Sequence, residues 1–313
     1  MLLATATHSQ RQPASWPDKQ PIRIIVPAGP GGPNDVLARL VAQHLQSSLK
    51  QSIVVEHRPG AGGGIGARTV AAAAPDGYSL LVGNTATLAV IPAVSRNPGY
   101  DAAKDFVGIA KLIAAEQVLV VAPALPVHSV TELVAYAKAN PGKLNFSSSG
   151  AGNLTHLSGE LFNVKAAVDI VHVPYKSDAE SATAVVGGQV QLSFSNTALM
   201  QPLINDGKLR ALGVTSATRL KDLPDLPAIA ESVPGYAVTS FFGIVAPART
   251  PPAIVERLNK ALNDGMVAGE MRESILNLKW ALAPSTSQEF SSFIAAEQQK
   301  WRMIAEQANI RID

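Results

Sequence analysis

The chain has 313 residues, of which 47% are apolar and 16% charged, with a net charge of +2 and no cysteine. This length allows about two domains with full cores, and the composition excludes a disordered or fibrous chain. Scattered basic residues and only 5% aromatic residues argue against a nucleic-acid surface. The absence of cysteine excludes disulfides, a thiolate metal site and a cysteine nucleophile.

The first 20 residues are expected to form a leader outside the fold. Residues 1–6 are apolar but few, and residues 7–20 are polar with two prolines. We expect an unstructured start or the remnant of a signal peptide. No apolar run reaches the roughly 18 residues that a membrane span requires.

The first ordered unit predicts a place for an anion. Residues 24–26 are a β-branched apolar run typical of a buried strand, and the glycine- and proline-rich residues 27–33 interrupt regular structure. Asn34 or Asp35 is predicted to cap the helix that follows. Backbone amides and the positive end of a helix dipole converge at such a turn, which favours an anion near Gly31, Gly32 and Asn34.

The same order of strand, small polar loop and helix recurs along the chain. Strands are predicted at residues 52–56, 78–82, 107–110, 116–122, 144–146, 170–173, 191–194, 209–214 and 238–245. Helices are predicted at residues 68–74 and 290–308. Further helices are predicted to be capped by Ser129, to open at about Thr155, to end at Val186 and to start at Pro251 and Pro252. Short strands alternating with helices favour βαβ units with a parallel sheet, an α/β fold. We expect two lobes between which the chain crosses twice, lobe 1 from residues 21–118 and 243–313 and lobe 2 from residues 119–242.

The polar loops lie where the predicted strands end, and ligands of open α/β sheets bind there. Two such rims facing each other form a cleft. We therefore expect ligand contacts from rim residues and their neighbours in both lobes: Ala28, Gly31, Gly32, Asn34, Asp35, Asn84, Thr85, Thr87, Ser148, Ser149, Gly150, Asn153, Thr155, His156, Tyr175, Lys176, Ser195, Asn196, Phe241 and Phe242.

Enzyme signatures are weak in this sequence. Gly62, Gly64 and Ala67 match the form of a dinucleotide fingerprint, but the next strand ends at Gly83-Asn84, without the acid that would bind a ribose. The six histidines show no paired metal spacing. We therefore expect no catalytic residue, metal or cofactor, and a site that holds a small polar anion. A small nucleotide-dependent oxidoreductase or a hydrolase is the alternative, because a triad assembled in space leaves no spacing in the sequence.

Several motifs give the chain, from about residue 20 to residue 313, a resemblance to the Bug-type solute receptors of tripartite tricarboxylate transporters. These motifs are Pro27–Asp35, Arg58–Gly63, Ala74–Tyr78, Thr155–Phe162, Val173–Lys176, Gly187–Gln191 and Gly207–Leu212.

The resemblance implies a periplasmic, two-lobed Venus-flytrap protein of the periplasmic-binding-protein fold. Such a receptor closes on a small carboxylate and passes it to membrane permease subunits. It also implies a monomer, an anion held by amides of the first two rims, and Asp35 as a residue that orients the loop. A receptor that serves a signalling protein would use the same cleft, so transport and sensing both stay open.

Two departures from the family pattern suggest the type of ligand. Ala28 stands where relatives often have an aromatic residue, and Ser195 stands where some have an aspartate that could pair with an ammonium group. Our hypothesis is a carboxylate that is not an amino acid, such as a di- or tricarboxylate or a bulkier aromatic acid, with Phe241 or Phe242 as a flat wall.

Overall fold

The computed structural model describes residues 16–151, 153–278 and 280–307. Most of the expected leader lies outside these residues. Residues 16–20 are described and differ from the expectation, because Trp16 packs on Tyr78 and lies against the guanidinium of Arg257. This short segment is therefore part of lobe 1. None of the helices in the described residues is long and apolar enough to cross a membrane.

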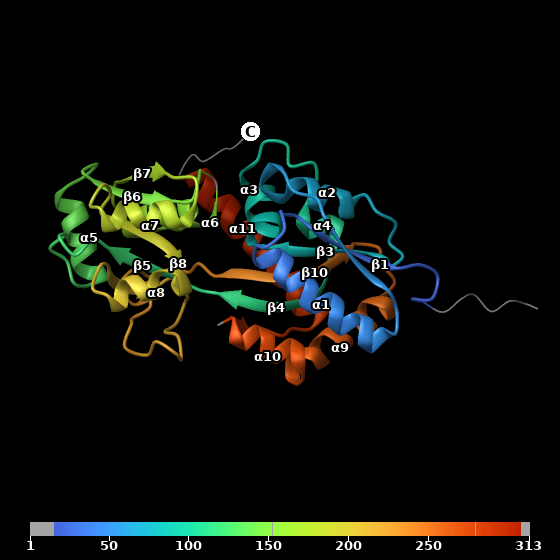
Figure 1. Ribbon diagram of the computed structural model, residues 1–313. Helices are drawn as coiled ribbons and strands as arrows, with labels where there is room; N and C mark the ends of the chain where they lie inside the picture. Colours follow the sequence, from blue (N-terminus) through green and yellow to red (C-terminus); the bar gives the residue numbers. More distant parts are fainter. Residues whose placement is uncertain (1–15, 152, 279, 308–313) are drawn as a thin grey trace, which may run out of the picture.

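Lobe 1 is built on a six-stranded sheet of order β11-β4-β10-β3-β1-β2 (Figure 1). Its strands are β1 (Ile22–Val26), β2 (Ile53–His57), β3 (Ser79–Asn84), β4 (Phe106–Ala115), β10 (Ser240–Pro247) and β11 (Ala281–Leu282). Its helices are α1 (Pro33–Leu49), α2 (Gly64–Ala71), α3 (Ile91–Val94), α4 (Ala102–Asp105), α9 (Pro252–Val267), α10 (Glu270–Asn277) and α11 (Ser287–Gln307). Two short turns of helix, η1 (Ala61–Gly63) and η2 (Ala86–Val90), follow β2 and β3.

Lobe 2 is built on a five-stranded sheet of order β7-β6-β8-β5-β9. Its strands are β5 (Gln117–Val121), β6 (Leu144–Ser148), β7 (Ile170–Pro174), β8 (Leu192–Asn196) and β9 (Arg210–Val214). Its helices are α5 (Val130–Ala139), α6 (Leu154–Ala166), α7 (Asp178–Val186) and α8 (Thr197–Asn205), followed by the short η3 (Ile229–Glu231). The two-lobed α/β architecture agrees with the prediction.

The sheets are mixed, which corrects the prediction of a parallel sheet. Strands β1, β2 and β3 pair in parallel, as do β6, β7 and β8, and these are the βαβ units visible in the sequence. The antiparallel pairs involve β4 and β10 in lobe 1 and β5 in lobe 2. Strands β4, β5 and β10 are those next to the crossings between lobes, so their direction is set by the crossing and not by a local helix.

The crossings lie slightly earlier in the chain than expected. Strand β5 begins at Gln117, and Ser240 of β10 already pairs with Ala115 of β4 in the lobe 1 sheet. Residues 240–242 therefore belong to lobe 1, although the sequence assigned them to lobe 2. The two chain segments that join the lobes run beside each other at this pairing.

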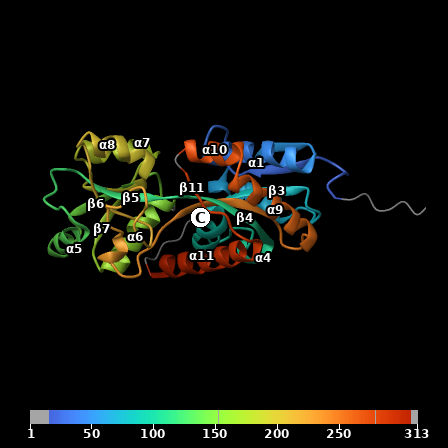
Figure 2. The ribbon, with the colours of Figure 1, turned by 90° about the horizontal axis from the view of Figure 1, so that it is seen from below.

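Helix α11 forms a third link between the lobes. It runs along the lower edge of lobe 1 in Figure 2, behind the sheet in the view of Figure 1, and extends toward lobe 2. Its Trp301 is fully buried in a core that also contains Phe162 of α6 and Tyr236. The ammonium group of Lys300 lies 3.3 Å from the carbonyl oxygen of Ala237. Residue 308, the predicted end of this helix, lies outside the described residues.

Candidate functional site

The loop after β1 is open on the side where a ligand could approach. Gly31 has φ +86°, in the left-handed region that favours glycine, and a Cβ added at Gly29, Gly31 or Gly32 would meet nothing within 4 Å. Helix α1 begins directly after the loop, at the side of lobe 1 that faces lobe 2 (Figure 1). Its N-cap is Gly32, which corrects the prediction of Asn34 or Asp35.

Asp35 fixes this loop through a hydrogen bond to the loop backbone. Its side chain is buried and accepts hydrogen bonds from the Gly31 amide at 2.9 Å and from Nε of Arg39 at 3.2 Å, while Nε2 of His57 lies 2.8 Å away. The hydrogen bond from the Gly31 amide, helped by Arg39 and His57, lowers the pKa of Asp35 to about 2. The amide of Gly31, which was predicted to hold an anion, therefore binds the carboxylate of Asp35 instead.

The second rim of lobe 1 is tied to the first. Nδ2 of Asn84 donates to Oδ1 of Asn34 at 3.1 Å, and the amide of Thr87 donates to Oδ1 of Asn84 at 2.9 Å. Thr85 accepts from the Phe241 amide at 2.9 Å. Both threonine side chains are buried. Thr85 and Thr87 thus make hydrogen bonds within the rim, and their contact with a ligand stays a prediction.

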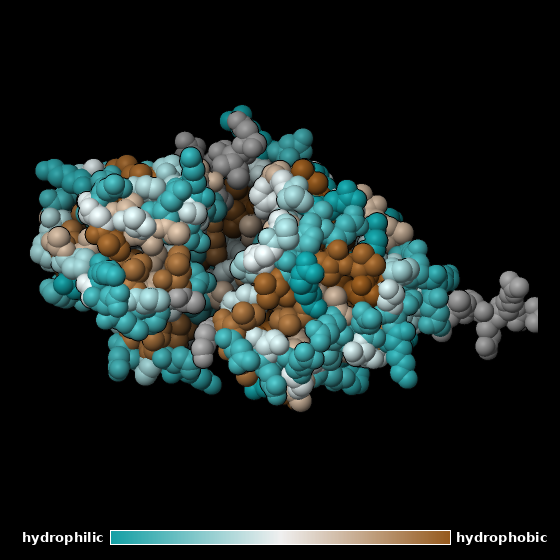
Figure 3. All heavy atoms as spheres, viewed as in Figure 1, coloured by the Kyte–Doolittle hydropathy of each residue, from teal (hydrophilic) through white to brown (hydrophobic). Residues whose placement is uncertain are grey.

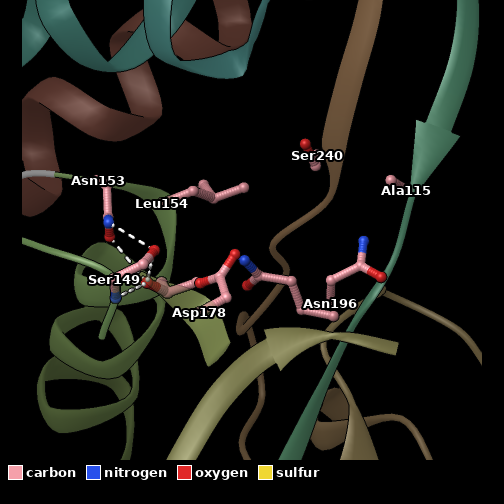
Figure 4. A pocket seen from close by; sticks show the side chains of 9 residues that line it. Ala115, Ser149, Asn153, Leu154, Asp178, Asn196 and Ser240 are labelled. Atoms are coloured by element: carbon pink, nitrogen blue, oxygen red, sulfur yellow. Dashed lines mark hydrogen bonds between the residues drawn. The ribbon is translucent and has the colours of Figure 1, made fainter. Parts of the chain in front are cut away.

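A cavity of about 220 Å³ lies at the rim of lobe 2, beside the crossing strands. It combines residues of the crossings with residues from the starts of α6 and α7 and the end of β8: Ala115, Gln117, Ser149, Asn153, Leu154, Thr155, Asp178, Asn196 and Ser240 (Figure 4). The surface is hollowed between the two lobes (Figure 3). The volume is below the roughly 300–1,000 Å³ of pockets for drug-sized ligands, so it suits a small molecule.

Three of the predicted residues form a hydrogen-bonded triangle on one wall of this cavity. Nδ2 of Asn153 donates to Oγ of Ser149 at 2.8 Å, Oγ1 of Thr155 donates to Oδ1 of Asn153 at 2.8 Å, and the Ser149 amide donates to Oγ1 of Thr155 at 3.0 Å. Asn153 is also the N-cap of α6, where it accepts from the His156 amide. The triangle fixes the wall before any ligand binds.

Two cavity residues were missed by the sequence analysis. Gln117 is the first residue of β5 and is buried, and its Oε1 accepts from Oγ of Ser158 at 2.6 Å. Asp178 is the first residue of α7 and points its carboxyl group into the cavity (Figure 4). The pattern Ser177-Asp178 signals only a helix start, and the direction of the side chain depends on how α7 packs.

Two histidines of lobe 2, His156 and His172, stack on each other near the cavity. The rings of His156 and His172 lie 3.8 Å apart, and Nε2 of His172 lies 2.6 Å from Oγ of Ser148. Burial of the ring, followed by the nearby His156, lowers the pKa of His172 to about 4. His156 and Ser148 are both buried, so the structure gives them a part in packing the rim.

The remaining predicted residues lie elsewhere. Phe241 is fully buried, with its ring 4.9 Å from that of Phe293, which contradicts its proposed role as a wall of the site. Phe242 is half-buried and its ring lies 6.5 Å from that of Trp280, nearly parallel to it. The other five differ in their surroundings. Ala28 and Tyr175 pack against core clusters, Gly150 donates its amide to Oγ of Ser148, Lys176 is exposed, and Ser195 is buried.

Within the described residues no group of three or more histidine, cysteine or acidic side chains is arranged to hold a metal ion. The geometry is that of two polar rims, one with a glycine loop at a helix start and one with a small preformed cavity.

Comparisons with known proteins agree with this geometry. Residues 37–310 match the family described as "Tripartite tricarboxylate transporter family receptor". The chain is 32% identical to Protein BugT of Bordetella pertussis over 314 residues, covering all of this chain and 96% of BugT. The chain therefore belongs to the tripartite tricarboxylate transporter receptor family, a family of periplasmic solute-binding proteins.

Two solved structures are similar over almost their full length. An R. palustris protein solved with adipate is 35% identical, with a TM-score of 0.77 and coverage of 95% of this chain and 99% of its own. A TctC solute binding protein from Polaromonas, solved with no ligand, is 25% identical, with a TM-score of 0.84 and coverage of 94% and 100%. Members of this family are receptors, so the chain is a binding protein and not an enzyme.

Proposed function

We propose that this protein captures a small carboxylate between its two lobes and delivers it to the membrane permease subunits of a tripartite transporter. The observation that carries the proposal is that lobe 1 has a glycine loop at the start of α1 and lobe 2 has a small polar cavity. The adipate present in the R. palustris relative supports a dicarboxylate as the class of ligand. We also propose that the protein is a periplasmic monomer.

The physical basis of the proposal is the start of α1. The first amides of a helix have no partner within the helix, and the helix dipole adds about half a positive charge there. Because Gly32 and Asn34 stand at this start and the loop is open to solvent, a carboxylate bound there would receive hydrogen bonds from the backbone. Aromatic acids stay within the proposed range, although Phe241 is not their wall.

A thermal-shift experiment with matched pairs of acids and amides tests this proposal. We expect dicarboxylates such as succinate and adipate to raise the melting temperature, whereas succinamide and adipamide leave it unchanged. Aromatic acids, tested against their amides, show whether the site accepts them. Equal shifts for acids and amides, or a shift with a nicotinamide nucleotide alone, would contradict the proposal.

Two variants of the glycine loop provide the matched control. Gly31→Ala places a Cβ at a positive φ and strains the loop, whereas Gly29→Ala adds the same atoms at a position without a positive φ. Both positions have open space around the added carbon. We expect Gly31→Ala to weaken acid binding about tenfold and Gly29→Ala to leave it unchanged, as measured by calorimetric titration. Binding by Gly31→Ala as tight as by the natural sequence would remove the loop from the site.

A further inference from the structure

The cavity of lobe 2 contains an acidic group that the proposed carboxylate ligand does not explain. Oδ1 of Asp178 is buried and has no hydrogen-bond partner among the described residues. A buried acceptor without a partner is rare in folded proteins and costly when it is a carboxylate. An oxygen of this kind that faces a cavity indicates the place of a ligand donor.

A purely structural role does not account for this side chain. Helix α7 is already capped by Ser177, whose Oγ accepts from the Glu180 amide at 3.2 Å. Glu180 supplies a second acidic residue in the first turn of the helix. Neither function requires the carboxylate of Asp178 to point into the cavity, as it does in Figure 4.

The neighbouring residues do not satisfy the free oxygen. Ser149, Asn153 and Thr155 are hydrogen-bonded to one another, and Oε1 of Gln117 is held by Ser158. No lysine, arginine or histidine is among the residues that line the cavity. Asp178 is therefore the one charged group of this wall within the described chain, and its charge repels any ligand carboxylate that approaches it.

We propose that Asp178 binds a hydrogen-bond donor of the ligand, so that the receptor selects carboxylates that carry a hydroxyl or ammonium group over unsubstituted acids. This inference rests on the proposed function, which places the ligand carboxylate at the lobe 1 loop. It differs from the hypothesis that excluded amino acids, because that hypothesis relied on Ser195 and did not consider an acid supplied by α7. A hydroxyl and an ammonium group share the chemistry that Asp178 requires.

Calorimetric titration with matched acids tests the selection and identifies the donor. The probes are succinate, malate and aspartate, which share a four-carbon chain, together with benzoate and 4-hydroxybenzoate. We expect the natural sequence to bind a donor-bearing acid about tenfold or more tightly than its unsubstituted parent, as for a hydrogen bond to a charged group. A preference for malate would indicate a hydroxyl group, and a preference for aspartate an ammonium group.

Substitution of Asp178 separates this inference from the proposed function. In Asp178→Asn we expect the ratio of the affinity for the donor-bearing acid to that for its unsubstituted parent to fall toward one. The unsubstituted acid should bind as well as before or better. Asp178→Ser, which also suits a helix start, is the second variant. The control is Asp206→Asn, the same chemical change at an exposed aspartate that pairs with Lys208, where the ratio should not move.

The outcomes are distinguishable. If acids bind the natural sequence with no preference for donors, or if the ratio survives in both Asp178 variants, this inference is wrong and carboxylate capture stands. If no acid of the panel binds, both the inference and the proposed function are wrong.

Discussion

Asp35 is the residue on which the geometry of the lobe 1 loop depends. Its buried carboxylate contacts the Gly31 amide, the guanidinium of Arg39 and the imidazole of His57. These contacts hold the glycine loop at the start of α1. Charge-assisted hydrogen bonds of this kind are stronger than neutral ones. The stability that ionised Asp35 supplies is present above its ordinary pKa of 3.8 and is lost as the pH falls through about 2.

Asp35→Asn is expected to destabilise the protein by about 1–3 kcal/mol at pH 7, because the neutral amide lacks the negative charge to which Arg39 and the Gly31 amide donate hydrogen bonds. Binding of the carboxylate should weaken at the same time, since the loop loses its anchor. Urea unfolding and calorimetric titration measure the two effects. Asp264→Asn, at an exposed pair with Lys260, is the control and should change neither.

Glu116 is a second unusual carboxyl group, and it lies at a crossing between the lobes. Burial raises the pKa of Glu116 to about 7, against the opposing effect of Lys111, and its Oε2 has no partner among the described residues. Since the folded pKa is raised, the contribution of this group to stability is greatest below its ordinary pKa of 4.5. It is lost as the pH rises through about 7.

We therefore expect Glu116→Gln to be more stable than the natural sequence at pH 8 by about 1–3 kcal/mol and similar to it at pH 5. Urea denaturation at the two pH values gives the difference directly. Glu132→Gln, at an exposed glutamate of α5, serves as the control. If the free energy of unfolding of Glu116→Gln depends on pH in the same way as that of the natural sequence, the carboxyl group of Glu116 does not cause this pH dependence.

At the scale of elements, α6 lies so close to β6 that one position on it admits only glycine. A Cβ at Gly159 would lie 2.2 Å from Cε2 of Phe146. Phe146 in turn packs against the stacked histidines and Phe194, so it has no free side to move toward. The close approach of α6 thus sets the position of the Asn153 triangle at the start of that helix.

Gly159→Ala is expected to cost about 1–3 kcal/mol in the free energy of unfolding, because the overpacked ring outweighs the better helix propensity of alanine. Thermal or urea unfolding measures the loss. Combining it with Phe146→Leu should recover part of the cost, since the smaller side chain makes room. If the double variant loses the sum of the stabilities that the two single variants lose, the added Cβ does not clash directly with the Phe146 ring.

Particular residues show how far the sequence determines the elements and the site. Strand, glycine loop and helix follow one another in sequence, so the lobe 1 rim could be predicted, and the polar residues after β6 and β8 placed four predicted residues in the cavity. Gln117 and Asp178 were missed because side-chain direction at a strand start or helix start depends on packing between elements. Phe241 and Phe242 alternate across β10, and the sequence does not reveal which face meets α11.

At the scale of the molecule, the two lobes are joined by the crossing strands and by α11. The fold superimposes better on the unliganded Polaromonas protein, with a TM-score of 0.84, than on the adipate-bound protein, with 0.77, although the latter is more similar in sequence. We predict from this difference that the present conformation is the one without ligand, with the lobes apart. A ligand that contacts both rims would stabilise the closed arrangement through its additional contacts.

Small-angle X-ray scattering should therefore show a smaller radius of gyration when the protein is saturated with the acid that binds it most tightly. Curves calculated from the present structure should match the protein without ligand. Asp178→Asn, saturated with an unsubstituted acid, is expected to close as well, because the other polar residues of the lobe 2 cavity remain available to the acid. An identical radius with and without a saturating acid would argue for a rigid receptor.

Capture of a carboxylate is tested most directly by native mass spectrometry of the purified protein mixed with a panel of carboxylic acids, their amides and nucleotides. We predict one acid bound per chain, no amide and no nucleotide, in competition at equal concentrations. A bound nucleotide, or amides retained as well as acids, would contradict the account.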